Sequence, residues 1–282
     1  MIFQIMNRGQ IASVIITTKN EESVVARLIE SIKNQTYKYK EIILVDNKSW
    51  DKTAGIAKKM GAKVYIFGPE RSAQRNFGAK KARGKYLLFL DADMELTPDV
   101  LKDCVEICYK DKKIGGVVIP EESKAHTFWE KVKAFERSFY NESGDEVTDA
   151  ARFFKKEAFQ KVGGYDETIT GPEDWDFSES IKKSGYIIGR VNSLIFHYER
   201  IKSPFDLAGK KFYYALKAHR YLNKQKISIL SPKTIYFLRP VFLRHFDKIL
   251  AHPILSAAMF IMLTIELFGG TLGYLAGRIK KL

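Results

Sequence analysis

Short apolar runs that alternate with amphipathic segments constrain the fold of this chain more than any other feature. Strands are predicted over residues 12–18, 41–46, 63–67, 86–90 and 116–119. Helical spacing fills the intervals between the first four strands, over residues 19–35, 50–61 and 71–82. Because the strands are apolar along almost their whole length, we expect them to be buried on both faces. The pattern therefore predicts an α/β fold, with a mostly parallel sheet and helices on both of its faces.

The 282 residues carry a net charge of +14, which is concentrated toward the C-terminal end. Residues 201–282 contain 14 Lys and Arg against 3 Asp and Glu, whereas residues 1–200 contain 33 against 30. A near-neutral globule followed by a basic region indicates a polyanionic partner, either nucleic acid or anionic lipid. We expect a folded domain over residues 1–200, basic amphipathic helices over 201–250 and a transmembrane anchor over 251–282.

A helix is predicted over residues 203–226, with apolar side chains on one face and basic ones on the other. Aromatic residues flank both faces. This pattern is typical of helices that lie on a membrane surface. The alternative is a helix that packs on the globule and leaves its basic face in solvent.

Residues 253–277 form an apolar stretch of 25 residues with one charge, Glu266. The stretch is long enough to cross ~30 Å of hydrocarbon. The alternatives are a buried helix of a soluble protein and a shallow hairpin that bends at Gly269–Gly270. A GxxxGxxxG pattern, which lets two helices approach closely and suggests a homodimer, is formed by Gly269, Gly273 and Gly277.

Two aspartates, Asp91 and Asp93, directly follow the apolar strand YLLFL. In an open parallel sheet, ligands bind at the carboxyl ends of the strands. The D-x-D spacing points both carboxylates toward one hard cation. Mg²⁺ or Mn²⁺ typically takes one or two carboxylates and completes its shell with water and phosphate oxygens. The pair therefore indicates a metal that bridges a diphosphate.

Several missing patterns narrow the function. The first ten residues are too short and too polar for a secretory signal. Cys104 and Cys108 have no neighbouring His or Cys with which to bind zinc, so we expect buried thiols in a reducing compartment. Neither G-x-G-x-x-G after the first strand nor GxxxxGK[ST] occurs, which argues against a dinucleotide site and a P-loop. A diphosphate held by a metal, without a glycine loop, suggests a nucleotide-sugar.

Four segments in this order resemble the motifs of glycosyltransferase family 2, whose members have the GT-A fold. They are VIITTKNEE (14–22), VDNKSWDKT (45–53), RSAQRNFGAKKARGKYLLFLDAD (71–93) and GGYDETITGPEDWDFSESIKKSGY (163–186). The first segment departs from the family pattern, because Thr17 and Lys19 replace a usual Pro and Tyr. The resemblance covers about residues 12–198. It implies a Rossmann-like GT-A domain and transfer of a sugar in a single displacement with inversion.

The resemblance also implies a donor site. The nucleotide pocket is expected to be lined by Thr18, Asn20, Glu21 and Asp46. Asp46 would contact the base or ribose, although a helix cap is the alternative. Arg71 and Arg75 would add positive charge near the phosphates, and the alternative for each is a solvated helix charge. Asp91 would contact the ribose or a metal-bound water, and the candidate ligands of Mn²⁺ or Mg²⁺ are Asp93, Asp91 and His197. The alternative for His197 is a hydrogen-bonded loop residue.

The last motif supplies the candidate general base, Asp174, which would take the proton from the acceptor hydroxyl. Glu173 is its acidic neighbour in the nucleotide-sugar site, unless it serves only the helix dipole. KAHRY (217–221) loosely resembles the Q-x-x-R-W element of cellulose-synthase-like members, and only Arg220 matches. If this match holds, Arg220 reaches the diphosphate.

These observations predict a membrane-attached inverting glycosyltransferase that transfers a hexose to a lipid-linked acceptor. Mannose from GDP-mannose is favoured, and a dolichyl or polyprenyl phosphate or an N-glycan precursor would accept it. One alternative is a UDP-glucose-dependent polyprenyl-phosphate glucosyltransferase, and another is a non-catalytic binding module. The basic load on 201–250 favours a catalytic domain on the cytoplasmic face. We expect no nucleic-acid partner, because the basic residues are interleaved with a span-length apolar segment and no nucleic-acid motif occurs.

Overall fold

The structure is a computed structural model, and it describes residues 10–141, 144–145 and 147–280. The expectation for the first ten residues therefore falls almost wholly outside the described chain. Two compact units are present. Unit 1 comprises Met1–Pro120, Ala150–Glu167 and Phe177–His197, and unit 2 comprises Glu121–Asp149, Thr168–Asp176 and Tyr198–Leu282. The expected boundary near residue 200 follows sequence order, whereas these units interleave along the chain.

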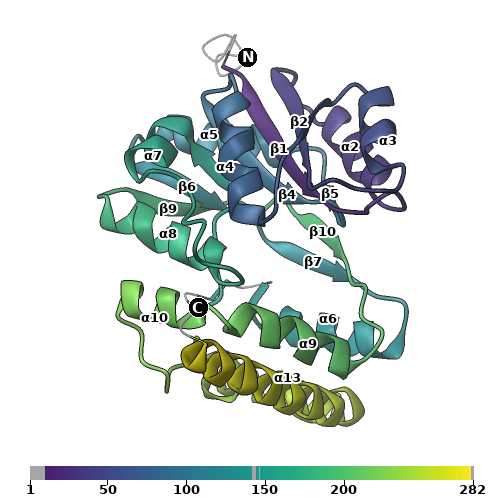
Figure 1. Cartoon of the computed structure of the whole chain (residues 1–282), viewed down its shortest axis with the longest axis vertical. Helices are drawn as coiled ribbons and strands as arrows, with labels where there is room; N and C mark the ends of the chain where they lie inside the picture. Colours follow the sequence, from purple (N-terminus) through teal and green to yellow (C-terminus); the bar gives the residue numbers. More distant parts are fainter. Residues whose placement is uncertain (1–9, 142–143, 146, 281–282) are drawn as a thin grey trace. The chain divides into compact units, whose positions relative to one another are not determined.

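Unit 1 contains a seven-stranded sheet in the order β3-β2-β1-β4-β8-β6-β9 (Figure 1). Its strands, in chain order, are β1 (Ala12–Thr18), β2 (Lys40–Asp46), β3 (Lys63–Ile66), β4 (Tyr86–Asp91), β6 (Ile114–Val118), β8 (Phe153–Lys155) and β9 (Ile187–Arg190). The first four strands are parallel, and β9 is parallel to β6. Only β8 runs antiparallel to its neighbours in this sheet, among the described residues. The predicted mostly parallel α/β sheet is confirmed.

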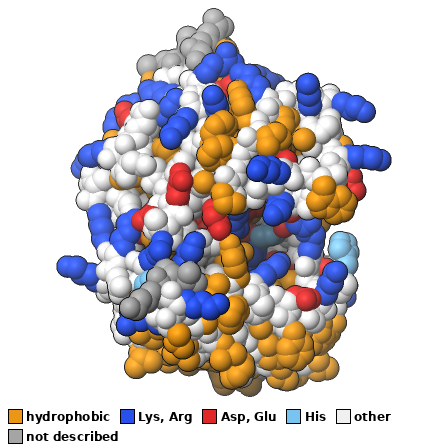
Figure 2. Space-filling view, in the orientation of Figure 1, with side chains coloured by type: hydrophobic (Ala, Val, Ile, Leu, Met, Phe, Trp, Pro, Cys, Tyr) orange, Lys and Arg blue, Asp and Glu red, His pale blue; other side chains and the backbone are white. Residues whose placement is uncertain are grey.

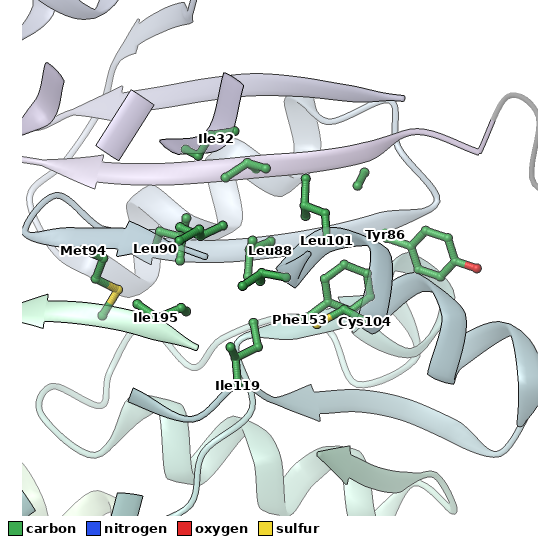
Figure 3. Packing of buried hydrophobic residues seen from close by; sticks show 14 of the residues in the cluster. Ile32, Tyr86, Leu88, Leu90, Met94, Leu101, Cys104, Ile119, Phe153 and Ile195 are labelled. Carbon is green, nitrogen blue, oxygen red and sulfur yellow. The ribbon is translucent and has the colours of Figure 1, made fainter. Parts of the chain in front are cut away.

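Helices cover both faces of this sheet, as predicted. Val14 and Ile16 of β1 point to one face, which is covered by α2 (Val25–Lys33), α3 (Thr53–Lys59) and α5 (Val100–Lys110). Figure 3 shows this cluster, in which Leu88 of β4 lies near Leu101. The opposite face carries Ile15, and it is covered by α4 (Arg71–Lys81), α7 (Lys156–Lys161) and the part of α8 (Glu173–Lys183) that belongs to unit 1.

The first helix begins later than the sequence predicted. It starts at Val25 rather than near residue 19, because Asn20 has a left-handed backbone with φ of +58° and residues 22–24 form a turn. The segment between β1 and α2 is therefore a loop. In addition, β5 (Met94–Leu96) pairs antiparallel with β10 (Ile195–Tyr198), which places His197 opposite Met94.

Unit 2 is mainly helical. Its elements are β7 (Glu121–Lys124), α6 (Phe128–Asn141), α9 (Pro204–Ala215), α10 (Ala218–Gln225), η1 (Tyr236–Leu238), α11 (Pro240–Arg244), α12 (Phe246–Ala251) and α13 (Pro253–Ile279). Val132 and Phe135 of α6 pack with Met259 and Met262 of α13 in one apolar cluster. The helix predicted over 203–226 is two helices, because the chain turns between α9 and α10.

The structure bears on two expectations for residues 253–277. The segment is one continuous helix, so the alternative of a hairpin at Gly269–Gly270 is wrong. The glycines of the GxxxGxxxG pattern, which suggested a homodimer, pack against α9 of the same chain. A β-carbon on Gly273 would lie 2.2 Å from the carbonyl oxygen of Phe212. The glycines do permit close helix approach, but within one chain.

A buried carboxylate, Glu41, ties three strands and a loop of unit 1 together. Its Oε1 accepts hydrogen bonds from Ser13 Oγ (2.7 Å) and from the backbone N–H of Arg83 (2.7 Å). Its Oε2 accepts one from Lys63 Nζ at 2.9 Å. Burial alone raises the pKa of Glu41, but the hydrogen bonds from Arg83, Lys63 and Ser13 outweigh it and lower that pKa to about 2.

We predict that Glu41→Gln lowers the free energy of unfolding at pH 7 by about 1–3 kcal/mol, the usual cost of losing charge-assisted hydrogen bonds. The depressed pKa means that the wild type keeps this stabilisation above the unfolded-state pKa of about 4.3. It then loses the stabilisation as the pH falls toward about 2. Urea unfolding between pH 7 and pH 3 measures both effects. The exposed Glu30→Gln is the control, and equal pH slopes for wild type and Glu41→Gln would contradict the assignment.

Candidate functional site

Three neighbouring strands of unit 1 end at the same edge of the sheet. Thr18 at the end of β1 is paired with Asp46 at the end of β2, and Thr17 is paired with Asp91 at the end of β4. The register therefore collects polar groups that are 28 to 74 positions apart in the chain. In α/β sheets this carboxyl edge is where ligands bind.

The Asp46 carboxylate organises the first part of this edge. Its Oδ1 accepts hydrogen bonds from the hydroxyls of Thr18 (2.9 Å) and Ser49 (2.5 Å), and its Oδ2 accepts one from the Ser49 N–H (2.7 Å). Asp46 is only 1% exposed. Its carboxylate therefore fixes the turn after β2 and the end of β1, the two segments that we expect to line a nucleotide site.

The loop after β1 is locked to the segment after β2. The Asn20 N–H donates to Ser49 Oγ at 2.7 Å, and Asn20 Oδ1 accepts from the Trp50 N–H at 3.1 Å. The Glu21 N–H donates to Thr53 Oγ1 at 2.8 Å. The predicted pocket residues Thr18, Asn20, Glu21 and Asp46 are thus brought together.

The second part of the edge is built around Asp91. Arg75 from α4, whose side chain is fully buried, donates to Asp91 Oδ1 at 3.3 Å, and Arg152 approaches Oδ2 at 3.6 Å. The Arg75 guanidinium also lies over the Tyr165 ring, 5.2 Å from its centroid. Burial alone raises the pKa of Asp91, but Arg75, Arg152 and Arg71 together hold it well below its usual range. Asp91 is therefore an anion among three arginines.

Asp93 has a different neighbour. Its Oδ1 lies 3.6 Å from His197 Nε2, and the two side chains are 20% and 14% exposed. The β5–β10 pairing produces this approach, because His197 lies opposite the residue that follows Asp93. An oxygen and a nitrogen at this separation fit a shared Mn²⁺ or Mg²⁺. The described residues contain no group of three or more His, Cys, Asp or Glu that would complete such a shell, so phosphate and water would supply the other ligands.

The remaining predicted residues, Glu173, Asp174 and Arg220, belong to unit 2. Glu173 is buried and Asp174 is half-buried in the first turn of α8. Arg220 lies on α10 and donates to the Thr168 carbonyl oxygen at 3.4 Å.

Helix α10 secures the segment that carries the acidic pair. Asp176 accepts hydrogen bonds from Lys224 at 2.7 Å and from Gln225 at 2.6 Å, while Tyr221 and Leu222 pack with Ile169. Asp176 therefore has a structural role in this segment. The half-buried Asp174 remains the better candidate for proton transfer.

Sequence reasoning missed two residues of the strand edge. Arg152, just before β8, gave no signal because it belongs to none of the four motifs. Gln74 lies inside the third motif, but only the charged residues of that motif were selected as candidates. Its side-chain amide donates to the carbonyl oxygens of Val45 (2.7 Å) and Thr18 (3.2 Å), which joins α4 to the ends of β2 and β1.

Comparison with known proteins identifies this arrangement. The family model described as "Glycosyl transferase family 2" matches residues 13–163, which is more than half of the chain. The chain belongs to glycosyltransferase family 2. This family 2 glycosyltransferase is 42% identical over 99 residues to the uncharacterized glycosyltransferase RT0209 of Rickettsia typhi, covering 34% of the chain and 32% of that protein.

A longer match joins it to the beta-monoglucosyldiacylglycerol synthase of Nostoc sp. The two are 28% identical over 196 residues, which cover 61% of this chain and 41% of the synthase. The chain therefore spans less than half the length of these curated relatives.

Two solved structures share the fold. Mannosyltransferase PcManGT from Pyrobaculum calidifontis, in complex with GDP-Man and Mn²⁺, superposes with a TM-score of 0.60 at 16% identity, covering 95% of this chain and 86% of PcManGT. S. aureus TarS 1-349 gives 0.56 at 17% identity, covering 95% and 91%. The family 2 glycosyltransferase thus has a GT-A-type fold, as the motifs predicted.

We predict that Asp46→Ala weakens nucleotide-sugar binding by roughly 10- to 100-fold, because Asp46 no longer holds the end of β1 and the turn after β2 in one arrangement through Thr18 and Ser49. Isothermal titration of the donor measures this effect. Asp99→Asn, an exposed carboxylate on the loop before α5, is the matched control. Unchanged donor affinity in Asp46→Ala would remove this residue from the pocket.

Proposed function

We propose that this chain transfers a hexose, with mannose favoured, from a nucleotide-sugar to a lipid-linked acceptor at a membrane surface. The observation that carries the proposal is the edge where β1, β2 and β4 end. There the hydrogen-bonded Thr18 and Asp46, the arginine-bound Asp91 and the Asp93–His197 pair follow the ends of neighbouring strands. PcManGT, of the same fold, was solved with GDP-Man and Mn²⁺, and this supports both the donor class and the metal.

In this proposal, the residues of unit 1 bind and orient the donor. The pocket between Thr18, Asn20, Glu21 and Asp46 takes the nucleoside. Arg71 would add positive charge near the diphosphate, and the fully buried Arg75 would act on it indirectly, by holding Asp91 in place. A divalent cation held by Asp93 and His197 would neutralise the charge that develops on the leaving diphosphate.

Asp174 acts as the general base in this proposal. The acceptor oxygen attacks C1 of the hexose, the bond from C1 to the diphosphate oxygen breaks, and the hydroxyl proton passes to the Asp174 carboxylate. The nucleoside diphosphate leaves with the electron pair of the broken bond. This single displacement inverts C1, and proton removal of this kind contributes typically 10²–10⁴-fold to the rate.

The lipid acceptor is supported by the relatives and by the composition of unit 2. A beta-monoglucosyldiacylglycerol synthase is, by its name, an enzyme of glycolipid formation. The net charge of +11 on residues 201–282 suits an acidic lipid headgroup. We place the active site on the cytoplasmic face for the same reason. The glucosyl group in the name of the same relative makes glucosyl transfer the second candidate, for which we expect UDP-glucose as the donor.

We expect isothermal titration to show Mn²⁺-dependent binding of one donor among GDP-mannose, UDP-glucose and UDP-GlcNAc. The double variant Asp93→Ala/His197→Ala should lose the metal-dependent part of that affinity, because both proposed ligands are gone, whereas Asp99→Asn should keep it. Binding of UDP-glucose alone would select the second candidate. If the folded wild type binds none of the three donors, the proposed donor site is wrong.

We predict that Asp174→Asn keeps donor affinity and lowers the turnover rate by about 10²–10⁴-fold. An amide cannot accept the acceptor proton, yet it preserves the shape of the first turn of α8. Single-turnover transfer to a polyprenyl phosphate or a glycolipid acceptor measures the rate. Asp247→Asn, an exposed Asp of unit 2, is the control. Loss of donor binding in Asp174→Asn would instead place Asp174 in the donor site.

A further inference from the structure

Helix α13 has 27 residues and is long and apolar enough to cross a membrane. Among the described residues it is the one helix that passes this test. Length and composition, however, say nothing about which faces of the helix are already covered. The contacts of α13 within unit 2 decide between a helix that crosses a bilayer and one that lies along its surface.

One side of α13 is in backbone contact with α9. A β-carbon on Gly269 would lie 2.5 Å from the Ala208 carbonyl oxygen, and one on Gly277 would lie 1.9 Å from that of Leu216. Figure 1 shows the two helices side by side along their length. If α13 crossed a bilayer with this packing intact, α9 would enter the hydrocarbon with it, together with Asp206 and Lys210.

Glu266, in the middle of α13, is held by the same unit. It is 1% exposed and forms ion pairs with Lys133 of α6 at 3.2 Å and with Lys211 of α9 at 3.5 Å. Lys133 also pairs with Glu136 at 3.0 Å, and Glu136 pairs with Arg239 at 3.4 Å. A chain of charges on α6, α9 and the segment before α11 therefore fixes one side of α13 to the protein. Charged groups of this kind are costly at the centre of a bilayer.

The opposite side of α13 is a continuous apolar stripe. It consists of Ile254, Ile261, Phe268, Leu272, Leu275 and Ile279, which are 45–81% exposed. The adjoining α11 and α12 add Leu243, Phe246 and Leu250, which are 54–80% exposed. Figure 2 shows hydrophobic side chains gathered where Figure 1 places α13. Soluble monomers rarely expose contiguous apolar patches larger than a few hundred Å².

Basic side chains accompany this apolar stripe. Arg244 is exposed beside Leu243, and Arg278 and Lys280 are exposed beside Ile279. A second copy of this chain seated on the stripe would bring like charges together. An anionic bilayer, in contrast, offers hydrocarbon for the stripe and phosphate groups for the basic residues.

We propose that α13 lies in the plane of an anionic bilayer surface instead of crossing it, with its apolar stripe in the hydrocarbon and its glycine and Glu266 side on α9 and α6. At 1.5 Å per residue, the helix would extend about 40 Å along the membrane. This proposal deepens the membrane part of the proposed function. It is tested without any sugar donor, so it can fail while the transferase activity stands.

The first test labels the two ends of α13. Ala251→Cys and Lys280→Cys, both exposed positions, bracket the helix. Each full-length variant is bound to sealed phosphatidylglycerol vesicles and treated with a membrane-impermeant maleimide from outside. We expect both ends to react fully before detergent is added. An end that reacts only after detergent opens the vesicles would show a spanning helix and overturn the proposal. The wild type is the blank, because Cys104 and Cys108 are buried.

The second test breaks the stripe. Phe268→Glu/Leu272→Glu should lower partitioning onto phosphatidylglycerol vesicles by about tenfold or more in a flotation assay, since two apolar side chains no longer enter the hydrocarbon. Trp50→Glu in unit 1, where the Trp side chain is 86% exposed, is the matched control and should bind like the wild type. An unchanged thermal transition confirms folding. Unchanged partitioning of the double variant would overturn the proposal. If that variant also changed from a dimer to a monomer in solution, the stripe would be an interface between two copies of the chain.

Discussion

The charge balance around Asp91 is the interaction on which the rest of the candidate site depends. Arg75 is fully buried, and a buried guanidinium is tolerated because Asp91 and the Tyr165 ring lie against it. Arg152 joins from a segment that the chain reaches about 60 residues later. The result is an anion embedded in excess positive charge at the end of the central strand. In the proposed function, a diphosphate balances this positive charge. The neighbouring Asp93 faces His197 instead.

Unit 2 shows how a helical unit can carry both an acidic segment and an exposed apolar stripe. The segment with Glu173 and Asp174 is secured by α10 through Asp176 and Ile169. The apolar stripe lies on α13, and the ion pairs of Glu266 connect that helix to α6 and α9. The opposing charges of Lys133, Glu136 and Arg239 stabilise one arrangement of helices by pairing, since any unpaired member would be a buried charge.

Much of the fold could be predicted from the sequence, because buried parallel strands consist of consecutive apolar residues. The D-x-D pair at Asp91 and Asp93 shows where one of these strands ends. The register could not be predicted residue by residue, although it decides that Thr18 meets Asp46. The late start of α2 was missed because the left-handed backbone of Asn20 has no signature that single-sequence periodicity detects. Arg152 was missed because its contact is distant in the chain. The packing of α13 was missed for a related reason: hydropathy measures composition, whereas the role of the glycines depends on which helix lies opposite.

The interleaving of the two units has a consequence for how such a protein can change. The chain passes from one unit to the other five times, at the boundaries that follow Pro120, Asp149, Glu167, Asp176 and His197. A membrane-binding part joined by one linker can be exchanged, lost or duplicated as a cassette. Here each unit consists of three separate segments of the chain, and segments of the other unit lie between them. Neither unit can therefore be inherited, cloned or replaced as one continuous piece. Changes in the properties of either unit must then arise by substitution within its existing helices and strands, not by domain shuffling.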